Sequence, residues 1–220
     1  MAELIVILVV LGIVLIVVAG VLSSRREKRK NQAIQAWAAA NRWYFSGPAQ
    51  VPWRDRVNYR NFQVRRLLNG DIDGMRASVS DCTYETQHSS TNADGHHTTT
   101  TTVHHLVIST AQLNGFWPDM ALTQRGLGSK MMRALGKRSP VESGHDEFDR
   151  RFRVDAADPG AAREYLSPAL VQALTQGEVP PWSLRAGELL VVWHGAMRPE
   201  DLDFHVWTLR RTAELLGRRL

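Results

Sequence analysis

The sequence predicts an α+β fold: an N-terminal transmembrane helix, then an antiparallel sheet of hairpins covered by a few helices, the last of them a C-terminal amphipathic helix. Three observations support this fold. An uninterrupted apolar run opens the chain at Leu4–Leu22, short alternating segments separated by turn residues fill its middle, and a helical apolar face closes it at Pro199–Leu216. We expect three parts: the transmembrane helix over 1–24, a basic juxtamembrane helix over 25–41, and a single α+β domain over 42–220.

The apolar run, Leu4–Leu22, contains no charged or amide side chain. At 1.5 Å of rise per residue, a helix of this length covers about 28 Å, close to the ~30 Å hydrocarbon thickness of a bilayer. A cleavable signal peptide would need a positive n-region, a shorter apolar core and a small-residue cleavage site. Here no Lys or Arg precedes the run, and Val18-Ala19-Gly20 matches a cleavage site only loosely. The sequence therefore favours a membrane-spanning helix.

Basic residues gather on the C-terminal flank of the run. Because positively charged flanks stay on the cytoplasmic side of a membrane, we expect the N-terminus outside and the domain in the cytoplasm. The lone cysteine, Cys82, suits a reducing compartment, since it cannot form an intramolecular disulfide. The basic side chains are also expected to contact anionic lipid headgroups. They are Arg25, Arg26, Lys28, Arg29 and Lys30.

The segment Arg25–Asn41 has no Gly or Pro and is rich in residues that favour helices, which predicts a helix continuing out of the membrane. Ile34, Trp37, Ala38 and Ala40 share a narrow helical face suited to docking on the domain. The chain has a formal net charge of +5, but outside this basic segment acids and bases nearly balance. We therefore expect no nucleic-acid partner.

Three strands are predicted in the first half of the domain. Phe62–Leu68 and Met75–Thr86 form a hairpin, with the reversal supplied by the turn residues of 69–74. Gln87–Thr100 is almost entirely polar, which predicts an exposed loop or a long hairpin tip, and it is the expected surface for a protein partner. Thr101–Leu113 is predicted to be a buried central strand.

The second half of the domain mixes helices with strands. A terminal hairpin is expected over Trp182–Trp193, and a closing helix over Pro199–Leu216 is expected to cover the sheet. Asp158 and Ser167 each precede a proline and predict helix N-caps. The other expected elements are a short amphipathic helix over Gly126–Leu135, a strand over Phe148–Val154, and helices over Ala161–Tyr165 and Ala169–Gln176.

Five of the eight histidines lie in one short stretch and raise the question of a metal site. Adjacent residues of a strand point to opposite faces, so His104 and His105 cannot share one ion, and Cys82 opposite His105 would supply two ligands at most. We therefore expect solvated histidines, with no metal ligands and no cofactor. The five are His88, His96, His97, His104 and His105.

Two other motifs resemble functional patterns only partly. Gly126–Lys130 lacks the Gly-Lys-Ser/Thr order of a Walker phosphate-binding loop. Glu142–Glu147 gathers Ser, His and carboxylate side chains, but folding rather than adjacency assembles a catalytic triad, and no Gly-x-Ser-x-Gly elbow is present. We expect a helix start and a polar turn, and the sequence assigns no catalytic residue.

Aromatic residues cluster just past the basic segment. Trp43 lies about 30 Å beyond the span if the chain between them is helical, too far for an interfacial aromatic belt. The cluster is therefore predicted to pack in the core. Its members are Trp37, Trp43, Trp53, Tyr44 and Phe45.

Several motifs follow one another in a distinctive order. After the apolar span come a basic helix ending in Ala-Trp-Ala-Ala-Ala-Asn-Arg-Trp-Tyr, a Thr/His-rich hairpin running into Thr-Val-His-His-Leu-Val, and the run Glu-Ser-Gly-His-Asp-Glu-Phe-Asp-Arg-Arg-Phe-Arg-Val. This order resembles an uncharacterised family of actinobacterial single-pass membrane proteins, whose Leu-x-Pro helix is matched by Leu166-Ser167-Pro168. The resemblance covers most of residues 31–217. It implies a cytoplasmic α+β domain at a bacterial plasma membrane and carries over no catalytic residue.

Three functions are compatible with these features. A membrane-tethered cytoplasmic binding or adaptor domain is favoured, because an anchor precedes a compact domain without a catalytic constellation. A membrane-anchored hydrolase would use His145 and Asp146 with a distant partner such as His194 or His205. An anionic-lipid sensor would act through the basic juxtamembrane segment.

Overall fold

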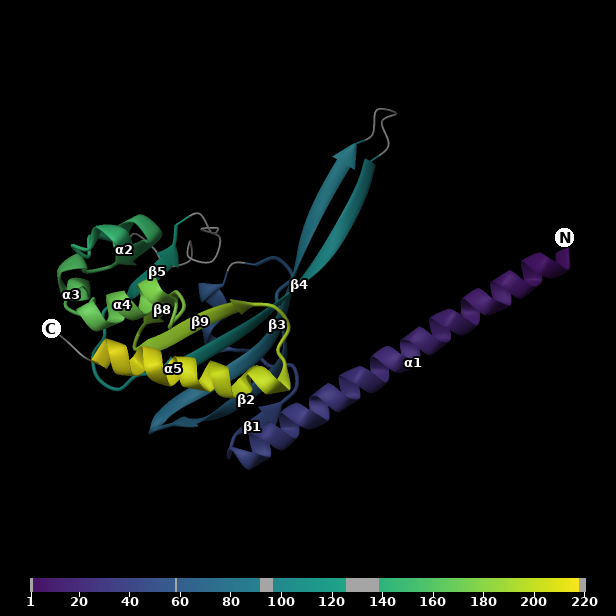
Figure 1. Cartoon of the computed structure of the whole chain (residues 1–220), viewed down its shortest axis with the longest axis horizontal. Coiled ribbons are helices and arrows are strands. Elements are labelled where there is room, and N and C mark those ends of the chain that lie inside the picture. Colours follow the sequence, from purple (N-terminus) through teal and green to yellow (C-terminus); the bar gives the residue numbers. More distant parts are fainter. Residues whose placement is uncertain (1, 58, 92–96, 126–138, 218–220) are drawn as a thin grey trace.

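A computed structural model describes the chain except residues 1, 58, 92–96, 126–138 and 218–220, and for residues 2–11 and 13–16 it describes the backbone only. Within this part, nine strands form one antiparallel sheet and helices pack on its faces (Figure 1). The predicted α+β class, with a C-terminal helix, is confirmed.

The two end strands of the sheet are short, and the longest strands are β2, β3 and β4. Their order across the sheet is β1-β2-β3-β4-β9-β8-β5-β7-β6. Their bounds are β1 Tyr44–Ser46, β2 Gln63–Ile72, β3 Met75–Thr91, β4 His97–Gln112, β5 Met120–Gln124, β6 Ser139–Val141, β7 Phe152–Ala156, β8 Trp182–Arg185 and β9 Glu188–His194.

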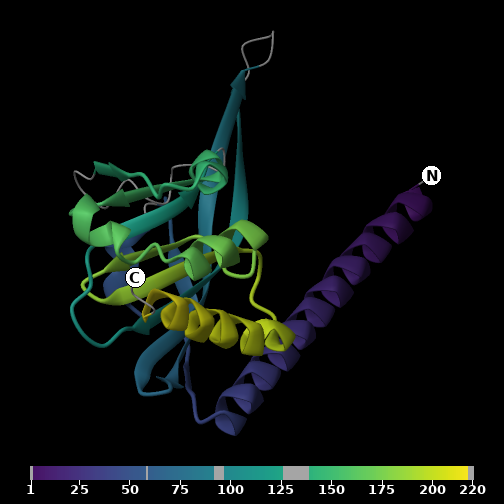
Figure 2. The ribbon, with the colours of Figure 1, turned by 60° about the vertical axis from the view of Figure 1, so that its left-hand side comes forward.

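The helices differ widely in length. The longest is the N-terminal one, which projects far from the domain (Figures 1 and 2). Those used below are α1 Ala2–Ala40, the 3-10 helix η1 Pro52–Arg56, α2 Asp146–Arg151, α3 Pro159–Arg163, α4 Pro168–Gln176, the 3-10 helix η4 Pro199–Asp201 and α5 Leu202–Gly217.

Helix α1 is continuous from the apolar run to the docking face, as predicted. Ile34 and Ala38 are buried and Trp37 is half-buried against the core, whereas Ala40 is exposed. Among the side chains that the structure describes, no helix is long and apolar enough to cross a membrane. The predicted span, Leu4–Leu22, falls largely on residues whose side chains lie outside that part.

The first hairpin reverses at Asp73-Gly74, where both residues have positive φ. Strand β2 therefore runs four residues past its predicted end at Leu68, and Gly70 lies inside the strand rather than in the turn. The glycine is needed there because a Cβ at Gly70 would lie 2.2 Å from the Trp43 ring. The ring packs directly on the strand backbone and is buried, as predicted for the aromatic cluster, whereas Tyr44 of that cluster is exposed, contrary to the prediction.

The polar segment Gln87–Thr100 was predicted as a loop or hairpin tip, and most of it belongs to strands. Strands β3 and β4 pair without interruption from Ala77 opposite Ala111 to Thr91 opposite His97. The far half of this ribbon projects from the domain (Figure 1). Its residues are exposed as predicted, but threonine is β-branched and favours strands, so polarity alone gave the wrong boundary.

The predicted strand Phe148–Val154 is wrong in its first half, because α2 occupies Asp146–Arg151 and β7 begins only at Phe152. Acids in the first turn of α2 and arginines in its last turn complement the helix dipole. Phe148 and Phe152 lie four residues apart and stack at 5.1 Å, which is a helical spacing rather than a strand one.

The helices after Asp158 and Ser167, the terminal hairpin and the closing helix agree with prediction, whereas strands β1, β5 and β6 were not predicted. Asp158 and Ser167 cap α3 and α4 with their side chains. Ala186-Gly187 turns β8 into β9, and α5 lies over the sheet. Leu209 of α5 joins the large core on one face, while η1 and its flanking loop cover a smaller cluster on the other. The predicted helix Gly126–Leu135 lies outside the described residues.

Candidate functional site

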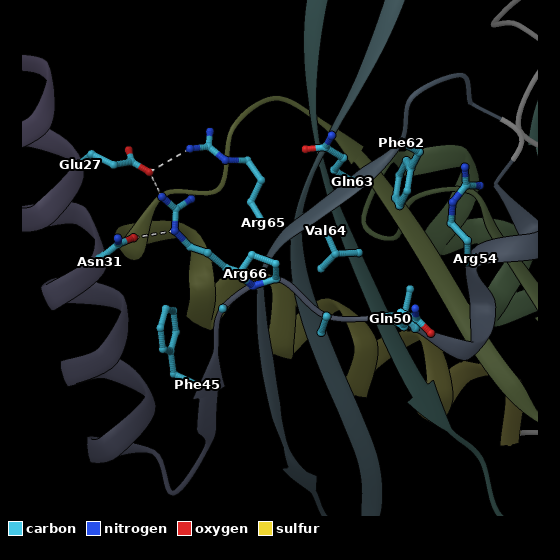
Figure 3. Close-up of a pocket in the computed structure, with 14 residues that line it drawn as sticks. Glu27, Asn31, Phe45, Gln50, Arg54, Phe62, Gln63, Val64, Arg65 and Arg66 are labelled. Atoms are coloured by element: carbon cyan, nitrogen blue, oxygen red, sulfur yellow. Dashed lines mark hydrogen bonds and ion pairs between the residues drawn. The ribbon is translucent and has the colours of Figure 1, made fainter. Parts of the chain in front are cut away.

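A cleft of about 1070 Å³ lies where α1 meets the edge of the sheet (Figure 3). We name it the α1–β2 cleft. Helix α1 forms one wall, the segment from Gly47 to η1 forms the other, and the start of β2 forms the floor. Its lining residues are Glu27, Asn31, Phe45, Gly47, Pro48, Ala49, Gln50, Val51, Arg54, Phe62, Gln63, Val64, Arg65 and Arg66.

The cleft exists because edge strand β1 is too short to cover β2. The three residues of β1 pair only with Leu67, Leu68 and Asn69 of β2. The chain then leaves the sheet at Gly47-Pro48, since proline cannot donate to a ladder. The stretch of β2 from Gln63 to Arg66 thus pairs with β3 on one side and faces the cleft on the other.

A β-bulge at Arg65 decides which face of the sheet each side chain on the cleft floor points to. Val64 pairs with Cys82 and Arg66 with Asp81, so one extra residue interrupts the alternation of faces. Val64 consequently packs with Cys82 in the cluster under η1. Arg66 turns to the opposite face, toward α1.

Arg66 is the centre of a charged network that joins α1 to the sheet. Its guanidinium donates to Asp81, to Glu27, and through Nε to Asn31 Oδ1 at 2.6 Å. The side chains of Arg66 and Asp81 are 5% and 1% exposed, so this is a buried ion pair. Glu27 also accepts from Arg65 at 3.3 Å (Figure 3). One carboxylate of α1 therefore contacts two arginines of the bulge.

The opposite wall is held by buried Arg56 of η1. Its guanidinium donates to the Ser183 carbonyl at 2.8 Å and to a Glu188 carboxylate oxygen at 3.1 Å. Burial lowers the pKa of Arg56 and raises the pKa of Glu188. This pair fixes η1 on β8 and β9, and with it the position of the cleft wall.

The cleft carries excess positive charge, since Arg54 adds a cation to Arg65 and Arg66, whose carboxylate partners are Glu27 and Asp81. Arg54 donates to the backbone carbonyls of Val57 and Tyr59, and its guanidinium lies 4.6 Å above the Phe62 ring. Carbonyl oxygens do not neutralise its charge. An anionic group entering the cleft would therefore meet a guanidinium on an aromatic surface at one end and Arg65 at the other.

The five basic residues predicted to touch lipid do not share one environment. The side chains of Arg25, Arg26, Lys28 and Arg29 are exposed. Lys30 instead lies 3.7 Å from Asp81 Oδ2. Sequence reasoning missed the network of Arg66, although a reversal at Asp73-Gly74 places Arg66 directly opposite Asp81. Opposite charges at paired strand positions were the signal.

The histidines form no common site. Cys82 lies opposite Leu106, not opposite His105 as proposed for a two-ligand site, because β3 and β4 pair with Thr86 opposite Thr102. Burial raises the pKa of the Cys82 thiol. His104 stacks on Tyr84 at 4.7 Å and bonds to Thr86. Among the described residues, no three His, Cys, Asp or Glu side chains lie close enough to hold a metal ion.

The residues named for a hydrolase lie at two different sites. Asp146 lines a cavity of about 770 Å³ beside α2 and α3. His194 and His205 line another, of about 490 Å³, between β9 and α5. The Ser143 hydroxyl accepts from the backbone N–H of His145, as in a polar turn. The glycine-rich motif Gly126–Lys130 falls outside the described residues.

Comparison with protein-family models, with curated proteins and with solved structures gives no match for this chain. The resemblance to actinobacterial single-pass proteins therefore stays an expectation from the sequence.

Proposed function

We propose that this protein is a membrane-tethered cytoplasmic binding domain whose α1–β2 cleft takes an extended acidic segment of a partner. The observation that carries the proposal is the uncovered stretch of β2 on the floor of a positively charged cleft, at the foot of the helix that continues into the apolar run. Strand edges bind extended peptides through main-chain hydrogen bonds, while adjoining side chains select them.

The shape and charge of the cleft support this ligand. The cleft has a volume of about 1070 Å³ and is lined by Gln63–Arg66 of β2. Phe45, Phe62 and Val64 offer apolar surface, and Arg54 and Arg65 offer positive charge. Because an unpaired edge beside arginines favours backbone pairing together with carboxylate contacts, an acidic strand matches both features.

The tether rests on the sequence of α1. Leu4–Leu22 has the length and composition of a span, and its basic flank predicts a cytoplasmic domain. A partner in the cleft would contact α1 itself, close to the membrane. The exposed Arg25, Arg26, Lys28 and Arg29 would then meet anionic headgroups, at about 1 kcal/mol for each side chain near the surface. These four side chains also favour a second candidate function, an anionic-lipid sensor.

The tether also requires α1 to bend. The β3–β4 ribbon and the N-terminal part of α1 project from the same side of the domain (Figures 1 and 2). If α1 crossed the bilayer straight, the polar ribbon would enter the hydrocarbon, where open strand edges are not tolerated. Gly20 and Ser23 provide a bending point: Ser23 Oγ donates to the Gly20 carbonyl at 3.3 Å, and Gly/Ser positions are common sites of helix kinks.

Selection from a random dodecapeptide display library tests the proposal. The full chain in detergent is the bait, compared with a Gln50→Glu/Gln63→Glu variant that adds two negative charges to exposed cleft positions. We expect acidic peptides to be enriched on the wild type and lost on this variant. The matched control, Gln32→Glu/Gln35→Glu, makes the same change at exposed α1 positions outside the cleft, and acidic peptides should still be enriched on it. No enrichment, or equal loss on both variants, would contradict the proposal.

A further inference from the structure

The far half of the β3–β4 ribbon is a two-stranded arm with both edges open. We define the arm as Thr86–Thr91 of β3 and His97–Val103 of β4. Strand β2 pairs with β3 only up to Thr83, and β9 pairs with β4 only up to Leu106. Within the described residues, the arm thus has no strand beside it. A bare two-stranded ribbon is marginally stable in water, because it buries almost no apolar surface.

The arm lacks the features that usually protect an open edge. Proteins guard edges with short strands, charges, prolines and bulges. The two ends of this sheet follow the rule: β1 and β6 have three residues each, and β6 contains Pro140. The described strands of the arm read TQHSST and HTTTTTV, without charge, proline or bulge. The arm edge is therefore open to pairing.

We infer that the β4 edge of the arm, Thr98–Val103, pairs antiparallel with the same edge of a second copy of this chain. Threonine and valine are β-branched and favour strands, whereas the β3 side of the arm is richer in Ser and Gln. Val103 is the only large apolar side chain in this stretch and is 54% exposed. Pairing of the β4 edges would cover it and supply partners for the outward-facing backbone groups.

A second copy suits this edge because the contact is self-complementary. In an antiparallel pair about a two-fold axis, residue i of one copy meets residue j of the other and j meets i, so an axis at Thr100, the middle of Thr98–Thr102, places Thr99 opposite Thr101 and Thr100 opposite itself. Five consecutive threonines, Thr98–Thr102, make opposing positions equivalent, and cross-strand Thr–Thr pairs are favourable. The uncharged side chains bring no like-charge repulsion. Two arms would then form a four-stranded sheet.

The oligomeric mass of the full chain in detergent, measured by light scattering with chromatography, tests this inference. The wild type is expected to be a dimer. Thr99→Lys/Thr101→Lys places charges on the pairing strand, close to their two-fold mates, and should raise the dimer dissociation constant more than tenfold. The matched control Gln87→Lys/Ser89→Lys changes their cross-strand partners on β3, one strand farther from the axis, and should remain a dimer.

Cross-linking gives an independent measure of the same contact. A Thr100→Cys variant, with native Cys82 buried, should form a disulfide-linked dimer under mild oxidation. The inference is overturned if the wild type is a monomer at every concentration up to about 100 µM. It is also overturned if the β4 variant, Thr99→Lys/Thr101→Lys, stays dimeric, because the contact would then lie elsewhere. Equal dissociation of both lysine variants would likewise overturn it, because the effect would then not depend on the β4 edge.

Discussion

Arg66 of β2 is hydrogen-bonded to Asp81 of β3 and also to Glu27 of α1, so one buried guanidinium connects these two strands to the N-terminal helix. The bulge at Arg65 makes this possible by turning Arg66 toward the helix. The position of α1, and with it one wall of the cleft, depends on a charge that is buried and must stay paired.

Replacing Asp81 with Asn should therefore destabilise the protein by about 3–5 kcal/mol, because it leaves the Arg66 charge buried without its main counterion. Chemical denaturation of the full chain in detergent measures the loss. Asp55→Asn is the matched control: it makes the same change in the exposed pair with Arg185 and should cost under about 1 kcal/mol. Equal effects of the two variants would show that the buried network does not hold the fold.

The sequence predicted the parts of the fold that depend on local signals. Turn residues gave the hairpin at Ala186-Gly187, and Asp158 and Ser167 gave two helix starts. Local signals gave the wrong element where the apolar spacing was compatible with both a helix and a strand. The phenylalanines at 148 and 152 fit both a helix and an irregular strand, and tertiary packing selected α2.

The cleft was not predictable because it depends on a register shift. A β-bulge adds one residue without a strong sequence signature, yet it decides that Val64 faces η1 and Arg66 faces α1. The basic run of α1 was read by its charge alone. Glu27 is the only acidic residue of that basic run, and it is the one that accepts hydrogen bonds from both Arg65 and Arg66 of the domain.

Shortening the arm should leave the domain folded. Thr86 lies opposite Thr102, so replacing residues 87–101 with Asn-Gly closes a two-residue hairpin in register. Exposed polar residues contribute little to the core, and loop closure depends weakly on length. The melting temperature of the full chain should stay within about 4 °C of the wild type. Unfolding of the shortened chain would show that the arm is structural.

Acid should weaken the protein partly through His205. Burial beside Trp193 and Phe204 lowers the pKa of His205 to about 4. Between pH ~6.5 and about 4 the unfolded chain binds this proton and the folded chain does not, so stability is full above that window and falls as pH drops through it, by up to about 3 kcal/mol. Denaturation at pH 7 and pH 4.5 should show a smaller loss for His205→Gln. Identical losses would exclude this histidine.

The proposed tether requires α1 to bend, and a bend near Gly20 and Ser23 would keep the arm in water when the chain is in a bilayer. A fluorophore on Thr100→Cys in the reconstituted chain should be quenched by iodide, whereas one on Val10→Cys, in the apolar run, should be protected. The raised pKa of buried Cys82 keeps the native thiol unreactive. Protection of both labels would place the arm in the hydrocarbon and contradict the bend.

The tether is the claim on which the proposed function depends, and a topology reporter tests it most directly. A reporter active only in the cytoplasm, fused after Leu220, should be active in the membrane fraction of bacterial cells, and one active only outside should be silent. Moving the charge of Arg25, Arg26 and Lys28 to the N-terminal flank should invert the two signals. Activity of the external reporter on the wild-type chain, or a chain recovered free of membranes, would contradict the account.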